Sequence, residues 1–367
     1  MKRPLLKLIF LLVLTGALLY FFGRSVEWRE VPAQIAAVNP PLFLLAVALA
    51  ALHFVTRSLR WQILIARQKL DVRFRNLVAA NVVGFTVSAV VPGRLGELVK
   101  PVYLARKESL PAGFTIGTVV IERIFDLTTQ CFLVGAFLIS RPLFAGSWPV
   151  GADAGRNLTF WGTAGVALAA VLVGASVALF VLRDKALRAV GFLLKPLPER
   201  ARAAVLRALA SFIEGLKIFR TPRQLALYAV LSLIVWLGIV LFYWVFFFAY
   251  RVKVPYFMVV PYVFLTAVGA SIPTPGMVGG FHYFSKLGMV LLLGLQADRA
   301  AGLTLVAHAV QIAVTCALGY AILAREGLTR IYALTLTLTV LVALFGAFAL
   351  AYVMARRLAL PLYILAE

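Results

Sequence analysis

The chain has 367 residues, of which 63% are hydrophobic, and its mean hydropathy is +0.97. A soluble core could not cover so much apolar surface, so the composition predicts an all-α polytopic membrane protein. The formal net charge of +22 would suggest nucleic acid in a soluble protein, but here Lys and Arg lie between hydrophobic runs, where they orient helices, so no nucleic-acid partner is expected.

The first predicted element is a membrane span at 5–23. Lys2, Arg3 and Lys7 accompany its start, as in a signal peptide. The run ends in the bulky residues 18–22, however, whereas a cleavage site needs small residues. We therefore expect a retained first helix with a cytoplasmic N-terminus.

Seven hydrophobic stretches are long enough to be full transmembrane helices. They lie at 5–23, 41–58, 113–138, 159–182, 225–249, 302–324 and 331–354. Residues 1–367 therefore form a single integral membrane domain, with a first repeat at 41–182 and a second at 225–354. The expected location is the cell inner (cytoplasmic) membrane.

Two linkers are strongly basic, one from Arg57 to Arg75 and the other at 183–224. The positive-inside rule places both in the cytoplasm. Within the longer linker, Leu206, Leu209 and Ile213 recur at helical spacing and predict an amphipathic helix. Two placements of that helix stay open: on the anionic inner leaflet, or packed against the membrane domain.

Two shorter apolar segments, at 76–92 and 256–275, do not fit the count of full spans. Each runs into a glycine-rich turn and another short apolar piece, a pattern typical of a re-entrant helical hairpin. Irregular backbone at membrane depth must be buried in protein or line a wet cavity, so the pair indicates a binding site. A simple packing kink is the alternative for the second turn. The predicted turn residues are Pro92, Gly93, Gly96, Pro273, Pro275, Gly276, Gly279 and Gly280.

The two hairpins resemble each other in sequence. A shift of 183 residues lays 92–97 over 275–280, and a shift of 185 lays Arg123 on His308. Coincidence of polar residues at otherwise apolar positions favours an internal duplication. The basic residues around the hairpins predict that the halves are inverted, which is an architecture of transporters.

The span at 113–138 carries Glu122, Arg123 and Asp126 near its middle, where each charge costs roughly 2.5 to 3.5 kcal/mol unless it is shielded. Either Arg123 neutralises Asp126 within a structural cluster, or the charges form a functional polar site. The basic groups and turn glycines suit a phosphate, whereas the carboxylates suit an amine or a transferable proton. His308 could shuttle protons or merely hydrogen-bond a neighbouring helix. The substrate-binding candidates are Arg94, Glu97, Lys100, Glu122, Arg123, Asp126, His308 and Gln311.

Three motifs carry a family resemblance: PGRLGE at 92–97, ERIFD at 122–126 and SIPTPGMVGGF at 271–281. With them the chain resembles, over nearly its whole length, the lysylphosphatidylglycerol synthase transmembrane-domain family, also called flippase-like domain proteins. The resemblance implies lipid translocation or support of lipid modification. Family members are associated with aminoacylated phosphatidylglycerol, hopanoids and polyprenyl-linked sugars, so the lipid stays open. Related sequences often carry an acidic residue after the second turn, where this chain has Gly280, Phe281 and His282.

The expected function is translocation of an anionic or modified lipid, of phospholipid, polyprenyl-linked or hopanoid type, through a central polar cleft. The alternatives are an intramembrane lipid head-group transferase or phosphatase, and a non-transporting scaffold for a lipid or glycan synthesis complex. No synthetase domain follows residue 354, so we do not expect this chain to aminoacylate a lipid itself. Metal-dependent phosphoryl or sugar transfer usually needs clustered acids or histidines on wet loops, whereas the loops here are short and mostly basic, so we expect no enzyme activity, no catalytic residue, no metal and no cofactor. Membrane lipids are the expected partners, with a separate enzyme modifying the lipid.

Overall fold

The computed structural model describes residues 2–24, 26–29, 31, 35, 37–90, 94–140, 199 and 221–326, and this part of the chain is helical without strands. Several sequence predictions fall outside these residues. They are the spans at 159–182 and 331–354, the turn residues Pro92 and Gly93, and the 183–224 linker apart from Glu199 and 221–224.

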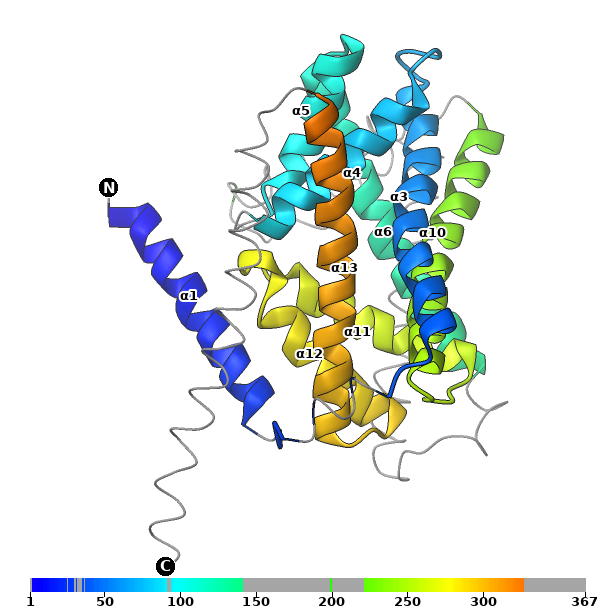
Figure 1. Ribbon diagram of the computed structural model, residues 1–367. Coiled ribbons are helices and arrows are strands. Elements are labelled where there is room, and N and C mark those ends of the chain that lie inside the picture. Colours follow the sequence, from blue (N-terminus) through cyan, green and yellow to red (C-terminus); the bar gives the residue numbers. More distant parts are fainter. Residues whose placement is uncertain are drawn as a thin grey trace, which may run out of the picture.

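Eleven helical elements make up the described residues (Figure 1). They are α1 (Lys2–Gly23), α3 (Pro40–Ile65), α4 (Phe74–Val90), α5 (Gly96–Glu108), α6 (Ala112–Ser140), α10 (Pro222–Ala249), η2 (Tyr256–Met258), α11 (Val259–Ser271), η3 (Pro275–Met277), α12 (Gly280–Leu293) and α13 (Ala297–Arg325). Among the described helices, α3, α6, α10 and α13 are long and apolar enough to cross a membrane. The predicted helices at 113–138, 225–249 and 302–324 are thereby confirmed, and α1 covers the first predicted span.

Helix α3 corrects one prediction. The sequence suggested a span at 41–58 followed by a basic cytoplasmic linker, yet the helix continues to Ile65 and includes Arg57 and Arg60. Both arginine side chains are buried. Counting charge by position along the chain treated them as loop residues, because it did not consider that acidic partners on another helix could neutralise them.

The long helices α3 and α10 begin with the same local chemistry. The side chain of Asn39 accepts a hydrogen bond from the N–H of Leu42 at 3.2 Å, and that of Thr221 accepts one from Gln224 at 3.2 Å. A proline follows each cap, where its fixed φ and missing N–H suit the first turn of a helix. Sequence alone therefore defines where both helices start.

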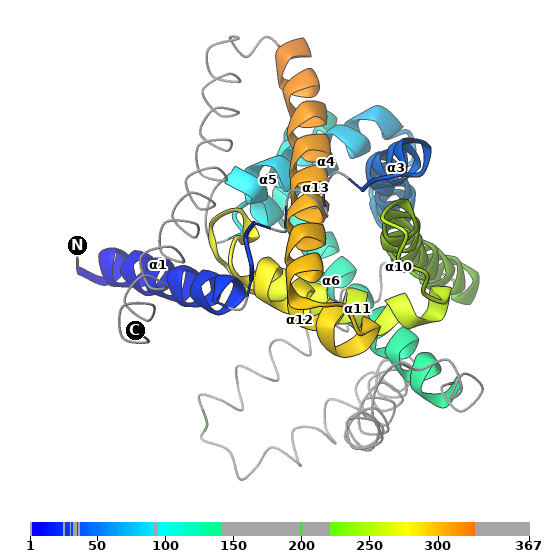
Figure 2. The ribbon, with the colours of Figure 1, turned by 60° about the horizontal axis from the view of Figure 1, so that its bottom comes forward.

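The helices of α3–α6 and of α10–α13 occur in the same order of lengths, with a long helix, two short helices and a second long helix in each group. Helices α6 and α13 both have 29 residues, and α3 and α10 have 26 and 28. Corresponding helices run in opposite directions: in Figure 1, α3 rises where α10 descends, and α6 descends where α13 rises. We call α3–α6 the first unit and α10–α13 the second unit. Figures 1 and 2 both place α3 beside α10, while α1 lies at the periphery against α12.

Each unit contains a pair of short helices held together by glycines. In the α4–α5 pair, a Cβ added to Gly96 would lie 1.7 Å from the carbonyl oxygen of Gly84. In the α11–α12 pair, a Cβ added to Gly280 would lie 2.4 Å from the carbonyl oxygen of Gly269. No side chain larger than hydrogen fits at either contact, so the backbones of both pairs meet directly.

The two units meet where the second hairpin turns. A Cβ on Gly276 of η3 would lie 3.1 Å from the carbonyl oxygen of Ala89, near the end of α4. The hydroxyl of Thr86 on α4 donates to the carbonyl of Thr315 on α13 at 3.1 Å. The second turn therefore packs inside the protein, against the first unit.

Candidate functional site

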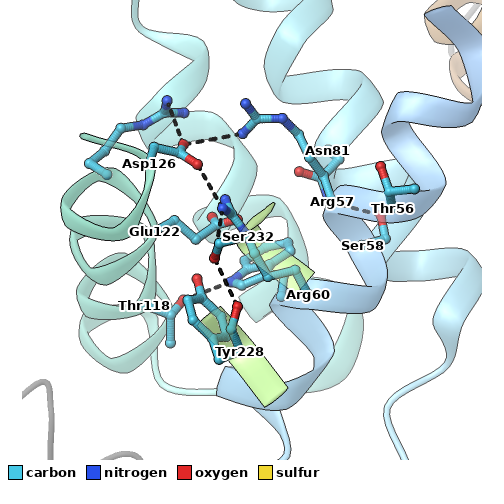
Figure 3. Close-up of polar contacts among 12 residues, drawn as sticks. Thr56, Arg57, Ser58, Arg60, Asn81, Thr118, Glu122, Asp126, Tyr228 and Ser232 are labelled. Carbon is cyan, nitrogen blue, oxygen red and sulfur yellow. Dashed lines mark hydrogen bonds and ion pairs between the residues drawn. The ribbon is translucent and has the colours of Figure 1, made fainter. Parts of the chain in front are cut away.

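Asp126 lies at the centre of a buried ionic network. Its carboxylate accepts a hydrogen bond from Arg60 at 2.6 Å, and the guanidinium groups of Arg57 and Arg123 lie 3.5 and 3.4 Å from it. The indole N–H of Trp236 also donates to Asp126, at 3.1 Å. Figure 3 shows Asp126 on α6 facing Arg57 and Arg60 from α3. Three cations and an indole thus stabilise one carboxylate away from water.

Glu122, one turn earlier on α6, holds two further cations. It forms ion pairs with Lys100 and, at 3.4 Å, with Arg60. The Lys100 ammonium lies 4.1 Å from the ring centroid of Trp61, and the Trp61 indole donates to Thr118 at 2.8 Å. Ion pairs, a hydrogen bond and an aromatic face therefore stabilise the polar groups around Glu122.

The outer end of the network is partly open to solvent. Arg94 forms an ion pair with Glu97 at 2.8 Å, and Arg123 lies 3.4 Å from the same carboxylate. The side chains of these three residues are 30% to 35% exposed. By contrast, those of Arg60 and Glu122 are 0% exposed. The network therefore leads from a fully buried core to an accessible end.

A cavity of about 390 Å³ lies beside the network. The first unit contributes all of the charged side chains that line it: Arg57, Arg94, Glu97, Arg123 and Asp126. The second unit contributes neutral side chains, most of them apolar, including Trp236, Phe242, Tyr243, Val263, Phe281 and Ile312. The cavity is therefore amphipathic, with a charged wall and a largely apolar wall.

Two residues of the cavity lining show how its edges are built. Gln311 is fixed in the apolar wall because its amide donates to the hydroxyl of Tyr243 at 3.0 Å. Leu127 lies one turn from Arg123 on α6 and is 54% exposed. An exposed leucine beside a charged group suits a rim that faces the acyl chains of a bilayer.

The predicted site residues occupy three different places. Arg94, Glu97, Arg123, Asp126 and Gln311 line the cavity. Lys100 and Glu122 belong to the network but are buried behind that lining. His308 is buried elsewhere, with its ring 4.7 Å from those of both Phe281 and His282. The predicted pairing of Arg123 with Asp126 is also present, at 3.4 Å.

The first predicted turn is described from Arg94 onward and the second through its whole length. Arg94 has φ of 56° and Met277 has φ of 58°, a left-handed conformation in two non-glycine residues at corresponding positions. Gly276 and Gly279 also have positive φ, and Pro273 is exposed. Both turns thus depart from helical geometry just before the second short helix of each pair begins.

Sequence reasoning missed the α3 contribution to the network. Arg57 and Arg60 supply two of the three cations on Asp126, and Arg57 donates to the Nε2 atom of His53 at 2.7 Å. One signal was available: His53, Arg57, Arg60 and Trp61 recur at the spacing of one helical face. Reading these positions as a helix face would have grouped both arginines on one side of a helix rather than in a loop.

The apolar helices and the amphipathic cavity between the two units define a multi-pass α-helical membrane protein with a buried ionic network. Residues 6–319 match the family described as lysylphosphatidylglycerol synthase TM region, and the chain belongs to that family. A comparison with curated proteins gives no significant match.

Proposed function

We propose that this protein moves a membrane lipid between the two leaflets of the cytoplasmic membrane through the cavity between its units. The cavity itself is the observation that carries the proposal, because its two walls match the two parts of an amphiphile. A lipid head group would contact the charged wall at Arg94, Arg123 and Glu97. The acyl chains would stay on the apolar side, at the rim that includes Leu127.

The arrangement of the units supports a mechanism of alternating access. We propose that α3–α6 and α10–α13 are the halves of an inverted repeat and that the pairs α4–α5 and α11–α12 are re-entrant hairpins. We also propose that the N-terminus of the protein lies in the cytoplasm. Inverted halves around a central site allow one half to rock against the other and expose the site to each side in turn. The contact between Gly276 and Ala89 lies at the boundary that such a motion would change.

Family membership adds chemical context to this proposal. The description of the family names a lipid-synthesis enzyme, and this chain matches the transmembrane region of that enzyme. On this proposal the protein carries out transport and leaves lipid modification to a separate enzyme. A lipid head-group transferase and a scaffold for lipid or glycan synthesis are the competing functions, and neither requires lipid to change leaflet.

A leaflet-exchange assay tests the proposal. Purified protein is reconstituted in vesicles that contain a fluorescent phospholipid, and a quencher added outside reports the fraction of lipid in the outer leaflet over time. We expect the protein to accelerate exchange. The double variant Arg94→Gln/Arg123→Gln is expected to slow it by about tenfold or more, since head-group contacts worth about 1.4 kcal/mol change a rate tenfold.

Arg106→Gln is the matched control, because Arg106 is an exposed arginine on α5, the helix that carries Glu97. It should exchange lipid at the wild-type rate. Thermal unfolding of each variant in detergent separates loss of transport from loss of fold. A folded double variant with wild-type exchange, or a wild-type protein that accelerates no lipid, would contradict the proposal.

A further inference from the structure

The ionic network contains more positive charge than negative charge. Among the residues that the structure describes, five cationic side chains and three carboxylates belong to it, which leaves an excess of two positive charges. The cations are Arg57, Arg60, Arg94, Lys100 and Arg123, and the anions are Glu97, Glu122 and Asp126. Charge in a partly desolvated site is stabilised by a counter-charge, so this excess favours an anionic partner.

Half of the excess lies at the cavity and half lies deeper in the network. Glu122 is shared by Lys100 and Arg60, two cations that do not line the cavity. Arg57, Arg94 and Arg123 do line it, and they face two carboxylates, Glu97 and Asp126. A ligand in the cavity therefore meets more cationic groups than acidic ones.

Hydrogen-bond donors are also in excess there. Each guanidinium carries five N–H donors, whereas a carboxylate has only two acceptor oxygens. The Nε atom of Arg123 makes no hydrogen bond within the described residues, although it lies 3.4 Å from Glu97. Planar guanidinium groups bind phosphate oxygens through paired hydrogen bonds, so phosphate is the anion whose shape fits these donors.

We infer that the cavity takes a lipid whose head group is a phosphate monoester or diphosphate, and that it disfavours aminoacylated, cationic head groups. The inference rests on the proposed function and names the substrate class of the same site. A phosphate monoester carries about 1.5 to 2 negative charges at neutral pH, enough to offset the excess of one at the cavity wall and most of the excess in the network behind it. A phosphodiester brings one negative charge, and a lysyl ester of a phosphodiester lipid has a net positive charge.

Three fluorescent probes with identical acyl chains test the inference in the leaflet-exchange assay. Their head groups are a phosphate monoester (phosphatidate), phosphatidylglycerol and lysyl-phosphatidylglycerol, in vesicles of phosphatidylcholine. We expect phosphatidate to move fastest, on the order of tenfold faster than phosphatidylglycerol, because one charge near several guanidinium groups is worth at least that much. Lysyl-phosphatidylglycerol should not exceed the rate in protein-free vesicles.

The outcomes separate this inference from the proposed function. If none of the three probes moves, both the proposed function and the substrate class are overturned. If lysyl-phosphatidylglycerol moves as fast as phosphatidate or faster, the substrate class alone is overturned. Uptake of radiolabelled inorganic phosphate into the same vesicles would assign the site to a free anion instead, and we expect none.

Two charge variants give a readout that a merely structural role would not produce. Arg94→Gln lowers the excess by one charge, and Glu97→Gln raises it by one. Both residues are partly exposed, so both variants should fold. The ratio of phosphatidate to phosphatidylglycerol exchange should fall in Arg94→Gln and rise in Glu97→Gln. Equal ratios in two folded variants would contradict the inference.

The same ratio should depend on pH. A phosphate monoester dianion takes up one proton near pH 6 and becomes singly charged, whereas a phosphodiester is singly charged throughout, so the ratio should fall between pH 7 and pH 5. The ionisable groups that line the cavity and face the phosphate include Arg57, Arg94, Arg123, Glu97, Asp126 and His53, and Arg57 also donates a hydrogen bond to His53. Their titration affects both probes, so phosphatidylglycerol is the internal control, and a ratio that stays constant would overturn the match of charges.

Discussion

The first unit and the second unit differ in the side chains that they bury. At corresponding positions, Asp126 is held by three guanidinium groups, whereas Gln311 donates only neutral hydrogen bonds among the described residues, to the hydroxyl of Tyr243 and the carbonyl of Ala307. The interior of the second unit is instead a large apolar cluster that includes Tyr243, Phe246, Phe247 and Tyr262. Helix order and glycine contacts match in the two units, but ionic chemistry is concentrated in one.

This difference teaches that backbone geometry and site chemistry are specified separately. The close approach of Gly84 and Gly96 in one hairpin is reproduced by Gly269 and Gly280 in the other, without any charge nearby in sequence. The hairpins therefore do not depend on the ionic network for their shape. Asymmetric side chains on matching backbones give the cavity its charged wall and its apolar wall.

The largest expected effect is at Asp126. Asp126→Asn leaves Arg57, Arg60 and Arg123 without their shared carboxylate, and loss of one partner from a buried ion pair typically costs about 3 to 5 kcal/mol. Gln311→Ala removes two neutral hydrogen bonds, to Tyr243 and to the carbonyl of Ala307, and should cost about 1 to 2 kcal/mol. Thermal unfolding in detergent measures both, and equal losses would mean that the units are not stabilised differently.

The glycine contacts should behave alike in the two units. Gly96→Ala and Gly280→Ala each place a Cβ within 2.4 Å of a facing carbonyl oxygen, and overpacking of this kind costs about 1 to 3 kcal/mol. Gly117→Ala on α6 is the control, because a Cβ there meets nothing within 4 Å. A large loss in one hairpin and none in the other, measured by thermal unfolding, would break the correspondence between units.

The far ends of the hairpins offer a pH-dependent comparison. Glu108, the last residue of α5 and outside the four candidate spans, receives hydrogen bonds from Lys69 at 2.9 Å and Asn76 at 2.7 Å. Burial alone would raise the pKa of Glu108, but these bonds lower it below the ordinary value of 4.5. The corresponding end of α12 is Leu293, which belongs to the apolar cluster.

The pKa of Glu108 is lower in the folded protein than in the unfolded chain. Its contribution to stability is therefore fully present at a pH above the pKa of the unfolded chain, and it is lost as the pH falls through the pKa of the folded protein. Glu108→Gln should therefore cost about 1 kcal/mol at pH 7, since Lys69 is partly exposed and the ion pair is screened. The difference from wild type should shrink as the pH falls below 4.5. Unfolding curves at several pH values measure it, and a Leu293→Met control should show no such trend.

The smallest expected effect concerns the helix ends themselves. Ser109 closes α5 with φ of 56°, and Gly294 closes α12 with φ of 67°. A left-handed residue other than glycine is strained, so Ser109→Gly should stabilise by about 0.5 kcal/mol and Gly294→Ala should destabilise by about 1 kcal/mol. Changes in stability of opposite sign for the two variants, measured by thermal unfolding, would be consistent with the same left-handed helix end in both units. Changes of the same sign would contradict it.

The sequence alone determined the class of the protein, three of its long helices and both short hairpin segments. Hydrophobic length defines a membrane helix locally, and Asn39-Pro40 and Thr221-Pro222 mark helix starts by local capping. It also identified Glu122 and Asp126 as charges in need of partners. These features depend only on residues near one another along the chain.

Tertiary structure alone decided which partners those charges have and where the site lies. Arg57 and Arg60 look like loop charges in sequence, yet α3 carries them into the core beside Asp126, which is more than 60 residues away in sequence. His308 looked like a site residue and is buried among aromatic rings instead. A buried charge requires neutralisation, but sequence does not specify which helix face will supply the counter-charge, because that depends on how helices distant in sequence pack together.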